Sequence, residues 1–204
     1  MLVSAADQAQ VEAAIAAAEK RTSGEIVAVV AGSSASYLSV APMAAALLAL
    51  LVPWPLIYFT WWRVQDIYLL QLLVFAVTAA LLYHRPFRVA LVPNSIKRDR
   101  AHKKAMEQFV AQNLYTTSGH TGVMIFLSEA ERYAEVVADQ NIYARVPQAE
   151  WQALVDRLTT RIGNGEVGGG LSDAIAAAGD LLAAHFPPGS SNPNELPNHL
   201  IVIE

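Results

Sequence analysis

Two uncharged, apolar runs constrain this chain more than any other feature of its sequence. They occupy residues 38–62 and 67–83, and only Arg63 and Asp66 interrupt the interval between them. About 20 apolar residues in a helix cross the hydrocarbon core of a bilayer. The short link between the runs requires the two helices to be antiparallel. We therefore predict a transmembrane helical hairpin over residues 37–84.

The composition agrees with a membrane segment beside an ordinary domain. Apolar residues make 54% of the chain and charged residues only 16%, whereas a soluble domain carries about 25% charged residues. The alternative is a buried helical hairpin, but 204 residues are too few to enclose two helices that are apolar all round. Cysteine is absent, which excludes disulfides, thiol nucleophiles and thiolate zinc sites.

Basic residues gather directly after the second run. Residues 85–104 hold seven Lys and Arg against one acid, Asp99, while the link between the runs carries only Arg63. Because cytoplasmic flanks are enriched in Lys and Arg, we expect both termini in the cytoplasm. Contact with anionic lipid is the favoured use of these side chains, a solvated helix face is the alternative, and the net charge of −4 disfavours nucleic acid. The candidate lipid-contact residues are Arg85, Arg88, Lys97, Arg98, Arg100, Lys103 and Lys104.

The remaining residues suit one discontinuous domain, 1–36 with 85–186, followed by a Pro-, Ser- and Asn-rich tail over 187–204. Residues 200–203 either form a short strand or pack elsewhere. The predicted class is an α/β (α+β) sandwich, in which helices flank a small mixed β-sheet and the two-helix transmembrane hairpin is inserted. The pattern predicts helices up to residue 21 and over 94–114, 148–162 and 171–186, and strands over 25–31, 122–127 and 132–138.

Five polar residues are candidates for chemistry. His120 lies in a glycine-flanked loop before a predicted strand, and Asp139 and Asn141 lie two residues apart at the end of the next strand. In an extended chain their oxygens would point the same way and could hold calcium or magnesium. Glu131 and Glu135 precede Asp139 at spacings of four, so the three acids could face one side. We take His120 and Asp139 as catalytic candidates, and Asp139, Asn141 and Glu131 as metal-ligand candidates, while turn caps and solvated loop residues are the alternatives.

The glycine-rich segment 163–168 matches the pattern G-x-G-x-x-G. In a dinucleotide-binding site this pattern follows a strand, whereas here it follows a predicted helix. We therefore predict a helix–helix turn, and no nucleotide cofactor.

Several stretches resemble the TPM domain. They are SGEIVAVV at 23–30, TGVMIFLSEAERYAEVVADQNI from Thr121, the helix around Trp151, GEVGGGL at 165–171, and the final Ala/Leu-rich helix. A bacterial subgroup carries a transmembrane hairpin between the first strand and the second helix, and this chain resembles that subgroup. The resemblance implies a mixed sheet with helices on both sides, acid phosphatase activity and calcium binding.

Two departures from the family pattern lie where the chemistry would be. The acidic pair that usually precedes the glycine opening the central strand is His120–Thr121 here, and the usual Gly-Tyr-Gly-like segment is 138–141. We therefore expect a domain of the bacterial inner membrane that binds or helps assemble and maintain partner membrane proteins without catalysis. A metal-assisted phosphatase using calcium or magnesium is the alternative. The expected partners are the bilayer and a membrane protein, and not nucleic acid.

Overall fold

The computed structural model describes residues 3–117, 119–188 and 194–203. The chain forms two compact units, one made of residues 1–34 with 98–204 and the other of residues 35–97.

The larger unit is built on a four-stranded sheet in the order β3-β2-β1-β4. β1 runs parallel to both β2 and β4, and β2 pairs with β3 antiparallel, so the predicted mixed sheet is confirmed. Residues 200–203, for which the sequence left two alternatives, form the edge strand beside β1. The strands are β1 (Glu25–Ala31), β2 (Gly122–Ser128), β3 (Tyr133–Ala138) and β4 (Leu200–Ile203).

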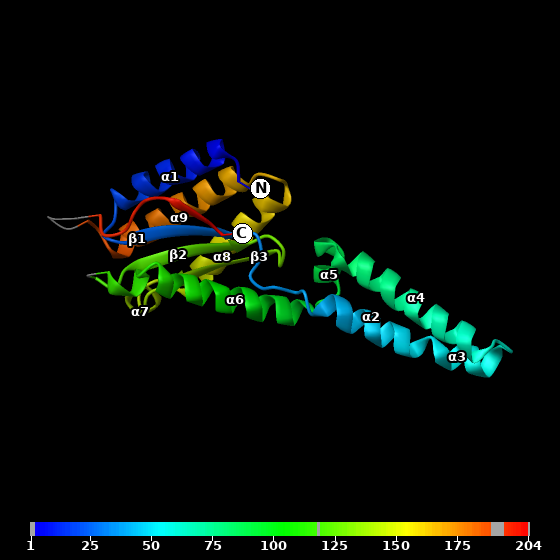
Figure 1. Cartoon of the computed structure of the whole chain (residues 1–204). Helices are drawn as coiled ribbons and strands as arrows, with labels where there is room; N and C mark the ends of the chain where they lie inside the picture. Colours follow the sequence, from blue (N-terminus) through cyan, green and yellow to red (C-terminus); the bar gives the residue numbers. More distant parts are fainter. Residues whose placement is uncertain (1–2, 118, 189–193, 204) are drawn as a thin grey trace. The chain divides into compact units, whose positions relative to one another are not determined.

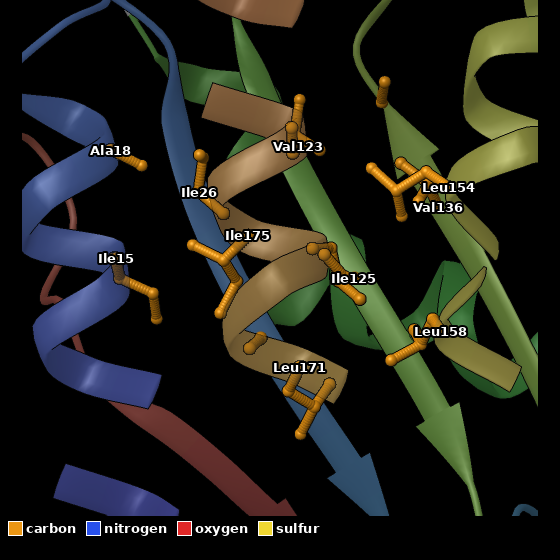
Figure 2. Packing of buried hydrophobic residues seen from close by; sticks show 14 of the residues in the cluster. Ile15, Ala18, Ile26, Val123, Ile125, Val136, Leu154, Leu158, Leu171 and Ile175 are labelled. Carbon is orange, nitrogen blue, oxygen red and sulfur yellow. The ribbon is translucent and has the colours of Figure 1, made fainter. Parts of the chain in front are cut away.

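Helices cover both faces of this sheet, which explains why β1 and β2 are buried throughout and apolar except at Glu25 and Ser128. One face packs against α1 (Ala5–Glu19), α8 (Gln148–Gly163) and α9 (Val167–His185), and the other against α6 (Asn94–Ala111) (Figure 1). Figure 2 shows Ile175 of α9 beside Ile15 of α1 and Ile26 of β1. Helices on both sides of a mixed sheet are therefore confirmed.

The segment after α8 is a helix–helix turn, as predicted, but the turn is shorter than the glycine-rich segment. The turn itself is short and contains Gly165 at φ +86°, but α9 begins at Val167, so Gly168–Gly170 belong to its first turn rather than to a link. Close packing of α1 on α9 is the physical reason. A Cβ atom at Gly168 would collide with Asp7, and one at Gly179 would lie 2.7 Å from the Cβ of Ala18.

The smaller unit contains two candidate membrane spans, Val40–Phe59 and Val64–Tyr83, each of 20 residues with mean hydropathies of 2.1 and 1.9. Both are long and apolar enough to cross a membrane. Ala41, Ala45 and Ala49 are buried at a spacing of four residues on the first span, where small side chains permit close helix contact. The helices are α2 (Val40–Leu51), α3 (Pro53–Phe59), α4 (Val64–Tyr83) and α5 (Arg85–Ala90).

The outer surfaces of these spans are strongly apolar. In the most apolar stretches only 17% and 11% of the residues are buried, and Leu50, Leu51 and Leu73 are each about three-fifths exposed. The core helix of a soluble protein would be mostly buried instead. One residue, Val52, separates the end of α2 from Pro53, which begins α3 and interrupts the first span as a helix-interior proline does.

Candidate functional site

The edge of the sheet where β2 begins and β3 ends brings two predicted site residues together. Val123 and Ala138 are paired across the two strands, and the backbone N–H of Asp139 donates to the carbonyl of Gly122 at 2.9 Å. Asp139 therefore lies at the start of β2, beside the loop that contains His120. The antiparallel pairing, rather than any local motif, creates this proximity.

The side chains of His120 and Asp139 are in direct contact. Asp139 Oδ2 lies 3.2 Å from His120 Nδ1, and Asp139 Oδ1 accepts a hydrogen bond from the backbone N–H of Gln140 at 2.7 Å. The Asp139 side chain is 13% exposed and the His120 side chain 62% exposed. The pair therefore presents a solvent-facing imidazole held by a largely buried carboxylate.

This arrangement fixes what the imidazole can do. A carboxylate that accepts the Nδ1 proton of a histidine orients the ring and leaves Nε2 for a proton or a cation. His120 adopts a positive φ of 50°, and its backbone N–H donates to Thr117 O at 3.0 Å. The loop thus holds the ring in a defined position, from which it can act as a general acid or base toward a group in solvent.

Asn141 belongs to the same edge but not in the predicted geometry. Of the two alternatives, the turn cap is the one that the structure has, because Asp139 is the N-cap of a short helix, α7 (Gln140–Tyr143), and the chain from Asp139 to Asn141 is not extended. The Asn141 side chain instead donates from Nδ2 to the carbonyl of Gly119 at 2.8 Å. Within residues 3–117, 119–188 and 194–203, no group of three or more His, Asp or Glu side chains is placed to hold a metal ion.

Glu131 lies at the opposite end of β2, in the turn between β2 and β3. The expectation that it shares one side with Glu135 and Asp139 is wrong, because Glu131 precedes β3 and is buried there. Its carboxylate accepts hydrogen bonds from the backbone N–H of Ser34, at 3.1 and 3.2 Å, and from the Ser128 hydroxyl. Glu131 therefore links the segment after β1 to the β2–β3 turn by hydrogen bonds.

A second ionisable cluster was not anticipated from the sequence. Glu135 of β3 contacts His102 of α6, with 3.0 Å between the carboxylate and Nδ1, and also accepts a hydrogen bond from the Tyr133 hydroxyl. Burial raises the pKa of Tyr133, and the neighbouring carboxylate adds to the effect. Glu135 and His102 are 33 residues apart, so only the position of α6 on the sheet could reveal their contact.

Two buried acids lie around the start of β1. Glu19 Oε1 accepts from the backbone N–H of Ile26 at 3.0 Å, and Glu25 accepts from the backbone N–H groups of Glu195 and Leu196 at 3.2 and 3.3 Å. Burial raises the pKa of Glu19 to about 7, and the charge of Glu25 adds to this rise. Burial also raises the pKa of Glu25.

The predicted lipid-contact residues lie on two helices. Arg98 and Lys103 are exposed on α6, and Lys104 Nζ lies 3.5 Å from Glu107 one turn further on. Arg85 and Arg88 belong to α5, and Lys97 and Arg100 belong to α6.

Comparison with known proteins supports the resemblance drawn from the sequence. The family model of the TPM domain matches residues 82–181. The NMR structure of the BA42 protein from the psychrophilic bacterium Bizionia argentinensis is similar at a TM-score of 0.62 and 19% identity, covering 98% of this chain and 94% of that chain. At this identity the likeness shows the fold alone. No curated protein matches. The resemblance to the TPM domain is therefore confirmed, and residues 82–181 are the part of the chain that matches it.

Proposed function

We propose that this chain is anchored in the bacterial inner membrane, where its TPM-like domain binds partner membrane proteins and helps assemble or maintain them without catalysis. The observation that carries the proposal is the exposed apolar surface of the two candidate spans. Leu50, Leu51 and Trp54 are 61%, 64% and 65% exposed. Fully burying one such side chain contributes about 1.5–3 kcal/mol, and a bilayer supplies that burial along both helices.

The distribution of charge supports a specific orientation. Lys and Arg are concentrated in residues 85–104, and the link between the spans carries only Arg63. Because basic residues favour the cytoplasmic side, both termini lie in the cytoplasm and the link lies outside. The TPM-like domain then meets the cytoplasmic parts of other membrane proteins at a raised effective concentration.

The sheet edge at His120 has the character of a protein-binding surface. Tyr115 is 46% exposed in the 3₁₀ turn η1 (Leu114–Thr116), shortly before His120. Tyr143 is 45% exposed on α7, the helix that Asp139 caps. Tyrosine is enriched at protein interfaces, where its ring buries a large apolar area and its hydroxyl group forms hydrogen bonds. We therefore place the partner contact at this edge.

Photo-crosslinking in native membranes tests this function. A benzoylphenylalanine at Tyr115 is expected to give one discrete adduct with a membrane protein, and the matched control at Gln152, exposed on α8, is expected to give none. The identified protein should then co-purify with the full-length chain in mild detergent. Adducts that are absent, or equally abundant at both positions, would argue against partner binding at this edge.

The contact between His120 and Asp139 also favours a second function, a metal-assisted phosphatase. Asp139 would bind calcium or magnesium, with the Asn141 amide oxygen as a candidate ligand, and His120 would protonate the leaving group. One carboxylate and one amide supply fewer oxygens than either cation requires, so phosphate and water would complete the shell.

Asp139→Asn separates the two functions. The amide oxygen still accepts the bond from the N–H of Gln140, so α7 keeps its cap, while the negative charge is lost. A phosphatase would lose its magnesium- or calcium-dependent release of phosphate from p-nitrophenyl phosphate. If purified wild-type protein shows no metal-dependent release, or if Asp139→Asn retains it, the phosphatase function is rejected.

A further inference from the structure

One side of α6 packs against the sheet, and the other side is exposed. Ala101, Ala105 and Phe109, spaced by four residues, are buried, and Ala105 and Phe109 belong to one cluster with residues of β1 and β2. His102 lies at the edge of this side and contacts Glu135 of β3. The outer α6 face, which points away from the sheet, consists of Arg100, Lys103, Lys104, Met106, Glu107 and Val110.

The outer α6 face contains exposed apolar side chains. Met106 is 42% exposed and Val110 is 54% exposed, four residues apart on the same side of the helix. With His102, Lys103 and Glu107 they line a shallow, open hollow on the surface of α6. A solvated face would carry polar residues at these positions, so this part of the helix is suited to an interface.

The same face concentrates positive charge. The face holds three basic residues, Arg100, Lys103 and Lys104, against one acid, Glu107, whereas residues 105–204 together hold four basic and twelve acidic residues. Glu107 lies beside Lys104, and Lys103 is exposed to solvent between the apolar and basic parts of the face. Basic and apolar side chains together are typical of helices that lie in a membrane interface.

We propose that the outer α6 face binds the headgroups of anionic phospholipids, with Met106 and Val110 inserted between them. The inference rests on the proposed membrane anchorage. Only ten residues separate Tyr83, the end of α4, from Asn94, the start of α6. A basic segment so close to a span experiences the negative potential of the cytoplasmic leaflet. The composition of the face favours a lipid surface over an acidic protein segment, because the exposed apolar residues Met106 and Val110 directly follow the basic residues on one helix.

The absence of native cysteine makes a site-specific test possible in the full-length chain. Met106→Cys, labelled with an environment-sensitive fluorophore, is placed in nanodiscs of phosphatidylcholine alone or of phosphatidylcholine with phosphatidylglycerol. Gln152→Cys on α8 is the matched control. We expect the emission at position 106 to shift to the blue and iodide quenching to fall several-fold only in the anionic discs. High salt should reverse both changes by screening.

Charge reversal separates lipid binding from a general effect of the label. Lys103→Glu, in the Met106→Cys background, changes the local charge by two and should lower the ratio of lipid-bound to free face about 30-fold. Arg157→Glu makes the same change at an exposed position of α8 and should have no effect.

The outcomes distinguish this inference from the anchorage itself. If the full-length protein fails to enter nanodiscs, the proposed membrane anchorage fails. If it enters, but position 106 reports the same environment in both lipids, the headgroup site is overturned while anchorage stands. Protection that is independent of lipid charge and salt would assign the face to a protein occupant and would also overturn the proposal.

Discussion

Glu19→Gln is expected to stabilise the TPM-like domain near pH 8 and to leave its stability nearly unchanged near pH 4.5. Glu19 is 8% exposed and accepts a hydrogen bond from the backbone N–H of Ile26. Burial raises its pKa from 4.5 to about 7. The folded protein therefore binds this proton more tightly than the unfolded chain does. The contribution of Glu19 to the unfolding free energy is fully present below pH 4.5 and is lost as the pH rises through 7.

The pKa rise sets the magnitude. A rise from 4.5 to about 7 corresponds to a loss of about 3 kcal/mol of unfolding free energy above pH 8. The hydrogen bond from the Ile26 N–H is weaker to a neutral glutamine than to a carboxylate, so we expect the variant to recover about 2 kcal/mol of this loss. Glutamine keeps an oxygen that accepts from Ile26 and carries no charge to desolvate. The variant therefore avoids most of this loss.

The assay is thermal unfolding of the full-length protein in a non-ionic detergent, followed by circular dichroism at both pH values. For a domain of this size, 2 kcal/mol corresponds to a rise in Tm of about 5 °C, expected for Glu19→Gln near pH 8 and absent near pH 4.5. Glu12→Gln on the same helix is the control and should give no pH-dependent difference. An equal offset of Glu19→Gln at both pH values would refute the coupling between Glu19 ionisation and folding.

Two other substitutions test how the site edges are built. Gly122→Ala should lower the unfolding free energy by about 1–3 kcal/mol, measured by denaturant titration, because a Cβ atom there would collide with the backbone carbonyl of Leu114. Gly163→Ala is the matched control, because a Cβ atom at Gly163 would meet no other atom within 4 Å. Equal losses of unfolding free energy in the two variants would contradict the clash at Gly122. Glu131→Ala should lower the unfolding free energy by about 1–3 kcal/mol, because it removes the acceptor of the Ser34 N–H. The backbone amide of Ser34 should then exchange its hydrogen faster. An unchanged exchange rate would contradict this role of Glu131.

Local pattern predicted the elements that depend on local chemistry. The run EIVAVVA predicted β1 over 25–31 and the structure has it there, because β-branched residues buried on both faces fit a central strand. The start of α9 was missed because glycine usually disfavours helix. Here the approach of α1 to Gly168 overrides that preference.

The candidate site required information that no short window contains. His120 and Asp139 could be singled out as polar residues flanking strands, but their contact depends on the register of β2 with β3. A turn cap at Asp139 was one of the alternatives that the sequence left open, and the structure has it as the N-cap of α7. The contact of Glu135 with His102 depends on how α6 lies on β3, which periodicity alone does not determine.

Cysteine accessibility in intact bacterial cells tests the central claim, that α2–α4 form a membrane hairpin with the TPM-like domain inside. Gln65→Cys lies exposed at the start of α4, and Gln152→Cys lies exposed on α8. A membrane-impermeant maleimide is predicted to label Gln65→Cys in intact cells and Gln152→Cys only after permeabilisation. Labelling of neither site before permeabilisation, with release of the protein from membranes by alkaline carbonate, would contradict the account.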